Sequence, residues 1–527
     1  MYSILIADPL DSSGVEILRA SGARVHQMTA DEKPRLLEML PDYDALVVRS
    51  ATKVTAEVLA AGKRLRVVGR AGIGVDNVDV KAATERGILV VNAPTANMMS
   101  ATEHTFALLL ALARRVPPAD ASMKSGTWDR KTFVGTELQG KTLGIIGFGR
   151  IGQRVAHRAR GFEMKVLAYD PFLDPAVARR EEVEPVTLDE LLPRADMVTL
   201  HTPLTEQTRN LLNRQRLAAM KPGALLINCG RGGVLDEAAL LELLESGHLG
   251  GAGLDVYAEE PVTDFALAKH PKVVATPHIG AQTREAQLRI AHDTAEMVIK
   301  ALEGSLAITA VNLPFRSAGP RGELLLGLAE QLGKLTSGLV DGRVQRVKVE
   351  LWGIEESLRH PIGVAALKGA LTPSMADGVN YVNAEHQATR RGIDLELSTR
   401  QGASEYSQLL RVRVDGLEGE VEAAGTVFGE RDVRVVSFRG FRLEFRPEDR
   451  LMFLRNKDVP GVVGRLGTFL GQAGINIADI HLAREPGKDD AVAALRLDKA
   501  ADASTVEALK RAVPEVLEAW VVDLGRP

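Results

Sequence analysis

The feature that constrains this chain most is a succession of short apolar runs between residues 141 and 277. The runs are LGIIG, KVLAYD, MVTLHT, ALLINC, GAGLDV and KVVATP, and helix-like segments separate them. Apolar runs of this length that alternate with helices are typical of a parallel sheet covered on both faces. We therefore predict that this stretch forms a doubly wound sheet of six strands.

Other stretches lie before and after this sheet. At 527 residues the chain is too long for one hydrophobic core, which stops growing at about 250–300 residues. After the linker NLPFRSAGPRG, helices mix with alternating strands such as QRVKVELWG. From about residue 450 the order is strand, helix, strand, strand, helix, strand, which predicts a ferredoxin-like unit. Because an isolated unit of this kind leaves an edge and one face uncovered, we expect two copies to pair. The first 98 residues repeat the alternation of runs and helices, with runs at Ile4–Ala7, Ala45–Val48, Arg66–Val68 and Ile88–Val91.

Composition and charge argue against several classes of protein. Lys and Arg number 65 and Asp and Glu 69, and the net charge of −4 argues against a dedicated nucleic-acid binder. The single cysteine, Cys229, can form neither an intrachain disulfide nor a cysteine-based metal site, and this usage fits a reducing compartment. No basic leader segment and no apolar stretch of about 18 residues is present. We expect a cytoplasmic protein that spans no membrane and binds neither metal nor nucleic acid.

The segment GFGRIG directly follows the run TLGII and begins a helical segment. Gly147 permits a tight turn, Gly149 lets backbone amides approach a pyrophosphate, and Gly152 lets helix and strand pack closely. The next strand ends in Asp170, whose carboxylate can accept hydrogen bonds from ribose hydroxyls and repels a 2′-phosphate. The pattern predicts NAD rather than NADP. A second glycine segment, GRAGIGVDN, has Asn77 in place of the third glycine, and we interpret it as a backbone cradle for a small anion or as a structural turn.

Three polar side chains follow strand ends in the predicted six-stranded sheet. His278 can accept the hydroxyl proton when a hydride leaves a secondary alcohol, because imidazole titrates near neutral pH. Arg231 can hold and polarise an α-keto acid through its planar fork. Glu260 can bond the other imidazole nitrogen and stabilise the imidazolium. Each of these residues alone is weak support for a catalytic site. The presence of all three at strand ends, in a sheet that also carries a nucleotide motif, favours hydride transfer.

The motifs GFGRIG, NCGRGG, LDVYAEEP, ATPHIGAQT and GRAGIGVDN resemble those of the D-2-hydroxyacid dehydrogenase family. The length and the C-terminal unit resemble the long form of this family. That resemblance implies an α/β fold with two doubly wound parallel-sheet domains, an α+β intervening domain and a ferredoxin-like ACT domain. The implied boundaries are 1–98 plus 285–312 for the substrate-binding domain, 99–284 for the Rossmann NAD domain, 313–449 for the intervening domain and 450–527 for the ACT regulatory domain.

The resemblance also implies the activity, which is NAD-dependent oxidation of D-3-phosphoglycerate to 3-phosphohydroxypyruvate, the first step of L-serine biosynthesis. Its catalytic set matches Arg231, Glu260 and His278. Positions that contact the substrate in the family match Arg49, Ser50, Arg70, Gly72 and Gly74, although Arg49 and Arg70 could instead be ordinary surface charges. Cofactor contacts match Ile73, Gly147, Gly149, Arg150, Ile151, Gly152, Asp170, Thr202, Cys229, Gly230, Arg231, Asp255, His278, Ile279, Gly280 and Ala281.

The same resemblance bears on regulation. Asp458 and Asn476 match positions that bind L-serine in some relatives, but purely structural roles fit them equally well. We expect a homo-oligomer, a tetramer, with contacts through the apolar helix near Ala101–Arg114 and through the C-terminal domains. Two alternatives remain open at this stage. One is a dehydrogenase for another D-2-hydroxy acid, and the other is an NAD-responsive regulatory protein.

Overall fold

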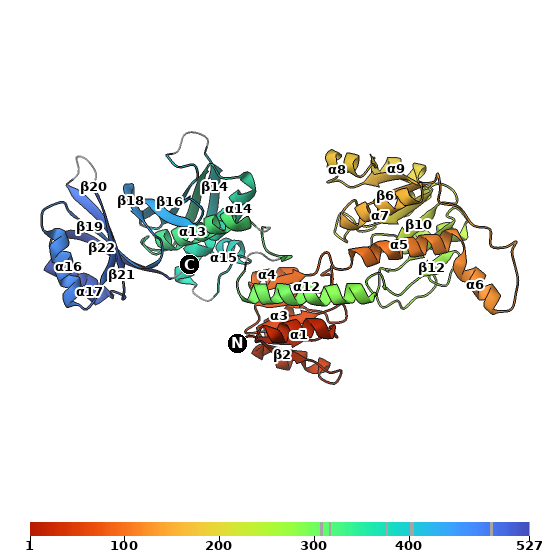
Figure 1. The fold of residues 1–527 in the computed structure, drawn as a ribbon, viewed down its shortest axis with the longest axis horizontal. Coiled ribbons are helices and arrows are strands. Elements are labelled where there is room, and N and C mark those ends of the chain that lie inside the picture. Colours follow the sequence, from red (N-terminus) through yellow and green to blue (C-terminus); the bar gives the residue numbers. More distant parts are fainter. Residues whose placement is uncertain (306–308, 316–317, 376–377, 401–404, 485–488, 526–527) are drawn as a thin grey trace.

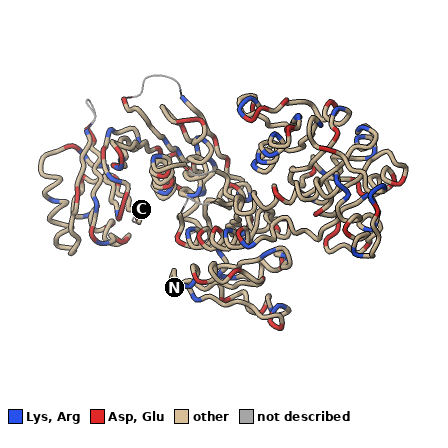
Figure 2. Tube along the Cα trace, turned by 45° about the vertical axis from the view of Figure 1, so that its right-hand side comes forward, with Lys and Arg blue, Asp and Glu red and all other residues tan. Residues whose placement is uncertain are grey.

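The computed structural model describes every residue except 306–308, 316–317, 376–377, 401–404, 485–488 and 526–527. The described chain forms four sheets, and along the longest axis of the molecule they lie in the order fourth, third, first and second (Figure 1). Basic and acidic residues are interspersed along the whole trace (Figure 2). Among the described residues, no helix has the length and apolarity needed to cross a bilayer.

The first sheet has five parallel strands in the order β2-β1-β3-β4-β5. Four of them lie at the predicted runs. The fifth, β2, was missed because RVHQ is polar and lies at the edge of the sheet. The strands are β1 (Ser3–Ile6), β2 (Arg24–Gln27), β3 (Ala45–Val48), β4 (Val67–Arg70) and β5 (Leu89–Asn92), and the helices are α1 (Ser12–Ala20), α2 (Leu36–Met39), α3 (Ala56–Ala61) and α4 (Val80–Glu85), with 3-10 turns η1 (Lys33–Arg35) and η2 (Leu40–Asp42).

The second sheet has seven parallel strands in the order β12-β11-β10-β9-β6-β7-β8. The prediction of a doubly wound sheet is confirmed. The prediction of six strands was one short, because β8 is only two residues long. The strands are β6 (Thr142–Ile146), β7 (Lys165–Tyr169), β8 (Glu184–Pro185), β9 (Met197–Leu200), β10 (Leu225–Asn228), β11 (Gly251–Leu254) and β12 (Val273–Ala275), and the helices are α5 (Met98–Ala113), α6 (Val116–Lys124), α7 (Arg150–Gly161), α8 (Pro175–Arg180), α9 (Leu188–Arg194), α10 (Arg214–Ala218) and α11 (Glu237–Glu245).

Helix α12 (Arg284–Leu302) returns from the second sheet to the first, where it lies beside α1 (Figure 1). Its buried side chains Ala295 and Val298 share a core with Ile4 and Val47. The approach is close, since a Cβ atom added at Gly69 on β4 would lie 2.5 Å from a methyl group of Val298. Residues distant in the sequence therefore complete the first sheet's core.

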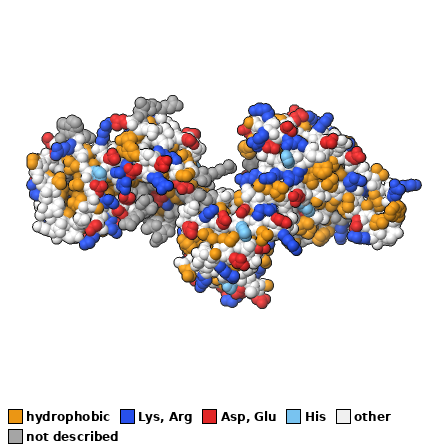
Figure 3. Space-filling view, in the orientation of Figure 1, with side chains coloured by type: hydrophobic (Ala, Val, Ile, Leu, Met, Phe, Trp, Pro, Cys, Tyr) orange, Lys and Arg blue, Asp and Glu red, His pale blue; other side chains and the backbone are white. Residues whose placement is uncertain are grey.

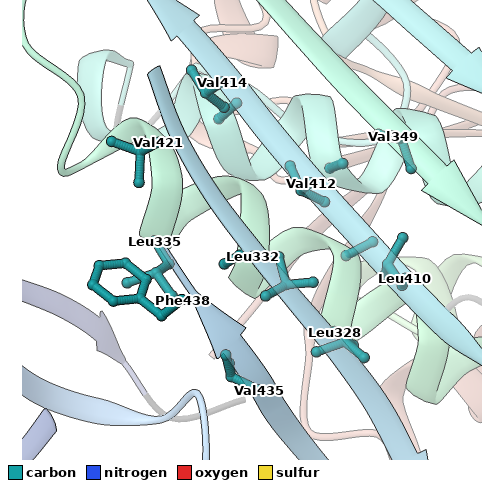
Figure 4. Close-up of a cluster of buried hydrophobic side chains, with 14 of the residues drawn as sticks. Leu328, Leu332, Leu335, Val349, Leu410, Val412, Val414, Val421, Val435 and Phe438 are labelled. Carbon is teal, nitrogen blue, oxygen red and sulfur yellow. The ribbon is translucent and has the colours of Figure 1, made fainter. Parts of the chain in front are cut away.

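The third sheet is mixed, with six strands in the order β14-β13-β15-β16-β17-β18. Figure 4 shows Leu328, Leu332 and Leu335 of α13 packed against valines of this sheet. The helices are α13 (Gly319–Ser337), α14 (Glu356–Leu371) and α15 (Ala384–Arg391), with the 3-10 turn η3 (Thr372–Ser374), and the strands are β13 (Arg346–Trp352), β14 (Asp394–Thr399), β15 (Leu409–Gly416), β16 (Gly419–Phe428), β17 (Asp432–Phe438) and β18 (Phe441–Phe445).

The fourth sheet has the order β20-β21-β19-β22 and confirms the predicted ferredoxin-like unit. Successive side chains of β19 point to opposite faces of the sheet, and the two faces have different partners. Met452 packs against the unit's own helices, whereas Phe453 joins the core of the third sheet. The expectation that this second face needs another copy of the chain was therefore wrong. The elements are β19 (Asp449–Lys457), α16 (Val462–Gln472), β20 (Ile477–Arg484), β21 (Asp490–Leu497), α17 (Ala503–Ala512) and β22 (Val516–Gly525).

Candidate active site

The glycine-rich loop GFGRIG lies between β6 and α7, as expected for a nucleotide site. Gly147 has φ +94°, a left-handed conformation that favours glycine. A Cβ atom added at Gly152 would lie 2.3 Å from the carbonyl oxygen of Gly147, so loop and helix pack too closely for any side chain there. Gly149 caps α7, and a Cβ atom there would meet nothing within 4 Å. The helix N-terminus, which begins with Arg150 and Ile151, is thus open to an anion.

Two polar groups beside this loop fit a dinucleotide. Asp170, just after β7, accepts hydrogen bonds from the amides of Phe148 and Phe172, both at 2.9 Å, and this fixes the carboxylate next to the glycine loop. Thr202 follows β9, the neighbour of β6, and its buried hydroxyl has no hydrogen-bond partner. A buried hydroxyl without a partner is costly unless a ligand pairs with it. The open helix terminus, the fixed carboxylate and this hydroxyl fit NAD.

His278 and Glu260 lie on loops that follow the neighbouring strands β12 and β11. Nδ1 of His278 is 2.6 Å from a carboxylate oxygen of Glu260, and the other oxygen accepts from the amide of Tyr257 at 3.0 Å. Burial raises the pKa of Glu260, but the hydrogen bonds from His278 and Tyr257 outweigh it and hold that pKa below its usual range. Glu260 is therefore a carboxylate near neutral pH and orients the imidazole, whose side chain is 45% exposed.

Asp255 holds the loop that carries His278. It is only 1% exposed. One of its oxygens accepts from the amide of Ile279 and the other from that of Gly280, both at 2.8 Å, and the hydroxyl of Thr276 donates to it at 2.6 Å. Burial raises the pKa of Asp255, but a hydrogen bond with His104, together with these bonds, lowers it to below its usual range. The segment from His278 to Ala281 is thereby held at the carboxyl edge of the sheet.

Arg231 lies on the loop after β10, the strand next to β11. The side-chain amide of Asn228 donates to the Arg231 carbonyl at 3.0 Å, and the side-chain oxygen of Asn228 accepts from the amide of Gly230, so the strand end shapes this loop. The preceding Cys229 is largely enclosed, and burial raises the pKa of its thiol to about 12. A thiol with such a pKa is a poor nucleophile at neutral pH.

The Arg231 side chain reaches across to the first sheet. Its Nε donates to Asp76 at 3.1 Å, and its Nη2 lies so close to Gly74 that an added Cβ atom would be 1.8 Å away. Gly72, with φ +150°, leaves room in the same way for the guanidinium of Arg70. Ile73 lies between these glycines, and its carbonyl accepts from the side chain of Asn92. The GRAGIGVDN loop is therefore held against two arginines.

Arg70 ends β4 and carries an incompletely paired charge. Its Nε is buried without a hydrogen-bond partner. Burial, together with the positive charges of Arg231 and Arg49, lowers its pKa to about 10, although Asp76 opposes part of this effect. Arg49 follows the adjacent strand β3, and the exposed Ser50 comes next. Arg231 and Arg49 both lie close enough to Arg70 to disfavour its charge, and a cluster of positive charges of this kind can bind an anion.

Asp458 and Asn476 are not brought together within one chain. Asp458 follows β19 and forms an ion pair with Arg484, at the end of β20, with 3.1 Å between the atoms. Asn476 precedes the other end of β20, where its amide donates to Asp498. The eight residues of β20 separate the two positions.

Sequence reasoning missed two residues of this region. Asp76 was visible in the GRAGIGVDN loop, but only the fold shows that it reaches Arg231. His104 on α5 lies 3.2 Å from Asp255, a residue 151 positions along the chain, and no local pattern indicates this contact. Among the described residues no cluster of three possible ligands could hold a metal ion.

Comparison with known proteins agrees with this geometry. Residues 106–280 match the family described as D-isomer specific 2-hydroxyacid dehydrogenase, NAD binding domain. Residues 324–439 match the D-3-phosphoglycerate dehydrogenase intervening domain. Among solved structures, D-lactate dehydrogenase from Aquifex aeolicus, complexed with NAD and lactic acid, is 31% identical with a TM-score of 0.52, and the match covers 58% of this chain and 96% of that one. The TT0316 protein from Thermus thermophilus is 40% identical with a TM-score of 0.55, and covers 59% of this chain and 99% of its own.

Two curated relatives are similar over nearly the whole length. The D-3-phosphoglycerate dehydrogenase of Methanocaldococcus jannaschii is 41% identical, over 99% of this chain and 100% of that protein. The D-3-phosphoglycerate dehydrogenase of Bacillus subtilis is 40% identical, over 99% of this chain and 100% of that protein. The chain therefore belongs to the D-3-phosphoglycerate dehydrogenase family of D-isomer-specific 2-hydroxyacid dehydrogenases.

Proposed function

We propose that this chain oxidises D-3-phosphoglycerate to 3-phosphohydroxypyruvate with NAD, the first step of L-serine biosynthesis, through His278, Glu260 and Arg231. The observation that carries the assignment is the 2.6 Å pair of His278 and Glu260 at the carboxyl edge of a sheet that also presents a dinucleotide loop. NAD is the cofactor, and when bound it accepts the hydride from C2 of the substrate. The chain's own residues accept the proton of the C2 hydroxyl and stabilise the charges that form.

His278 takes the proton. Its Nδ1 is held by Glu260, so Nε2 is the nitrogen left to accept the C2 hydroxyl proton as the hydride leaves. The imidazolium that forms then lies against an ionised carboxylate, which lowers its energy. Arg231 binds the carboxylate and the developing carbonyl oxygen of the 2-keto acid, where a planar fork can make two parallel hydrogen bonds.

The phosphorylated end of the substrate is assigned to the first sheet. Arg49, Ser50, Arg70 and the amides of Gly72 and Gly74 form its binding site. Burial and the positive charges of Arg231 and Arg49 lower the pKa of Arg70, and this supports the assignment, because a bound dianion would stabilise the charged guanidinium. In this proposal residues 1–98 and 285–312 bind the substrate, residues 99–284 bind NAD, residues 313–449 are the intervening domain and residues 450–527 are an ACT regulatory domain.

Cofactor contacts are assigned to the glycine loop and to the strand ends around it. The N-terminus of α7 would hold the pyrophosphate, Asp170 would hold the adenosine ribose, and the nicotinamide would lie beside His278. The open space at Gly149 and the unpaired hydroxyl of Thr202 support this placement. The remaining contacts are assigned to Ile73, Gly147, Arg150, Ile151, Gly152, Cys229, Gly230, Arg231, Asp255, Ile279, Gly280 and Ala281.

An NADH absorbance assay tests the function. With 3-phosphoglycerate and NAD, absorbance should rise, and His278→Ala should abolish most of the rise. Faster turnover of D-lactate or D-glycerate than of 3-phosphoglycerate would assign the chain to another D-2-hydroxy acid. NAD binding without turnover of any of these acids would favour an NAD-responsive regulatory protein.

A homotetramer is the proposed assembly, and α5 and α6 would form one of its contacts. Hydrophobic side chains gather over these helices (Figure 3). Phe106, Leu110 and Phe162 line a groove between α5 and α7, and Trp128, in the segment after α6, is 76% exposed. Burial of such a surface favours association. The solution mass decides the point, because a monomer would refute it.

L-serine is the proposed effector, bound between two paired C-terminal units. Antiparallel pairing of two β20 edges would bring Asp458 of one chain near Asn476 of the other, which one chain alone does not do. A serine titration of turnover tests this, with Asp458→Ala expected to abolish inhibition and leave basal turnover unchanged. Inhibition that survives the substitution would refute the site.

The single cysteine supports a cytoplasmic location, which cell fractionation would check.

A further inference from the structure

The backbone of His278 adopts an uncommon conformation. Its φ is +52°, in the left-handed region that side-chain-bearing residues rarely occupy. Such a conformation persists only where the surrounding structure holds it in place. The residues on either side of His278 should therefore be fixed by contacts outside the loop.

Those contacts converge on Asp255 and α5. Asp255 binds Thr276 on one side of His278 and the amides of Ile279 and Gly280 on the other. From α5, the hydroxyl of Ser100 donates to the carbonyl of Gly280 at 2.7 Å. The loop is thus tied at both ends to a single buried carboxylate and to one helix.

His104 completes this set one turn further along α5. Its Nε2 lies 3.0 Å from Oγ1 of Thr276 and 3.2 Å from Oδ1 of Asp255. The Thr276 hydroxyl has one proton and donates it to Asp255 at 2.6 Å, so toward His104 it can only accept. Nε2 of His104 must therefore carry a hydrogen and donate it to the threonine and the carboxylate.

We propose that His104 is a positioning residue for the catalytic histidine. It donates through Nε2 to Thr276 and Asp255, keeps the Asp255 carboxylate aimed at the amides of Ile279 and Gly280, and so holds the His278 imidazole where Glu260 and substrate meet it. His104 touches neither substrate nor cofactor in this role. The inference rests on the proposed function, because it assigns to His278 the proton transfer that depends on the position of its ring.

The experiment compares His104→Leu with His104→Gln in the full-length chain. Leu removes the donor, whereas the Gln side-chain amide places a donor near the position of Nε2. For His104→Leu we expect kcat to fall about 10–100-fold, the usual range for residues that orient an active-site group, with the KM for 3-phosphoglycerate changed less than about threefold. His104→Gln should recover most of the kcat.

A matched control is His248→Leu. His248 is also half-buried, and its Nε2 bonds one carbonyl, that of Met220, but it lies before β11, at the amino edge of the same sheet. It should lose no more than about twofold in kcat. Equal losses in His104→Leu and His248→Leu, or no recovery in His104→Gln, would overturn the proposal.

A second variant covers the case in which His104→Leu fails to fold. Thr276→Val keeps the shape of the side chain and removes the hydroxyl that His104 and Asp255 share, so it should lower kcat in the same way. Unchanged kcat in Thr276→Val would count against the network. If the unaltered chain shows no turnover with any D-2-hydroxy acid, the proposed function itself fails, and this outcome is distinct from a failure of the His104 assignment.

Discussion

The carboxylate of Asp76 accepts a hydrogen bond from Nε of Arg231 at 3.1 Å, and this pair joins the loop after β4 of the first sheet to the loop after β10 of the second. Arg231 is the residue proposed to bind the substrate carboxylate. A protein carboxylate therefore already lies at one edge of the guanidinium that the substrate must engage.

Asp76→Asn should strengthen anion binding. The substitution removes a negative charge that pairs with Arg231 and acts on Arg70, so substrate meets less repulsion and less competition. We expect the KM for 3-phosphoglycerate to fall by about 2–10-fold, and inorganic phosphate to become a better inhibitor. Steady-state kinetics measure both. A higher KM would indicate instead that Asp76 orients Arg231 for the substrate.

His278→Ala should lower kcat by roughly 10²–10⁴-fold, because it removes the acceptor of the hydroxyl proton. NADH binding, followed by fluorescence titration, should change little, since the glycine loop is untouched. Wild-type turnover in this variant would refute the assignment of the base.

Asp170→Ala should narrow the preference for NAD over NADP. The carboxylate that binds the ribose and repels a 2′-phosphate is lost. The ratio of kcat/KM for the two cofactors is the measurement. The amides of Phe148 and Phe172 also lose their acceptor, so a control melting curve should show a modest decrease in stability. A ratio equal to that of the unaltered chain would contradict the ribose assignment.

Arg70→Met should stabilise the ligand-free protein. Burial and neighbouring arginines lower the pKa of Arg70 from its ordinary value to about 10. Below that pH its charged form is therefore less stable in the folded chain than in the unfolded chain. Removal of that charge should raise the free energy of unfolding by about 1–2 kcal/mol near pH 8.

The same variant should lose the stabilisation that 3-phosphoglycerate gives. Thermal unfolding with and without substrate measures this, and Arg64→Met, which removes a half-exposed arginine paired with Asp44, is the control. A full substrate-induced rise in Tm for Arg70→Met would place the phosphate elsewhere.

Two truncations should behave differently. Removal of residues 451–527 would expose Phe438 and Phe445, which pack against Phe453 with ring centroids 4.4 and 5.4 Å away, so this product should aggregate or bind a hydrophobic dye. Removal of residues 313–527 leaves the two parallel sheets and α12, and this product should fold, because the match with TT0316 covers only 59% of this chain but 99% of that shorter protein. A stable, dye-silent product of the first truncation would contradict the shared core.

Much of the fold followed from local pattern. The runs around β6, β7 and β9 to β12 are apolar because both faces of the sheet are covered, and the glycines of GFGRIG mark the turn into α7. The polar edge strand β2 and the two-residue strand β8 lacked any such signal. For the third sheet, the sequence predicted only a mixture of helices and strands. The alternation of apolar and polar residues indicates neither the order of the strands nor the sheet that packs against them.

The candidate site divides in the same way. His278, Glu260 and Arg231 follow strand ends, so a parallel sheet suffices to bring them to one edge. The contacts of Asp76 with Arg231 and of His104 with Asp255 depend on how two sheets and a helix pack, which the sequence does not encode locally. The packing of the fourth sheet on the third was missed for the same reason. An apolar face predicts that the face is buried, but not which element buries it.

Strand β5 has contacts of two kinds at its two ends. Before its first residue, the carbonyl of Gly87 accepts a hydrogen bond from the side chain of Asn380, which belongs to the part of the chain that carries the third sheet. At its last residue, Asn92 donates to Ile73, between the two glycines that face Arg70 and Arg231. Because both contacts are made at the ends of one four-residue strand, the C-terminal half and the glycine loop beside Arg70 and Arg231 are attached to the same structural element.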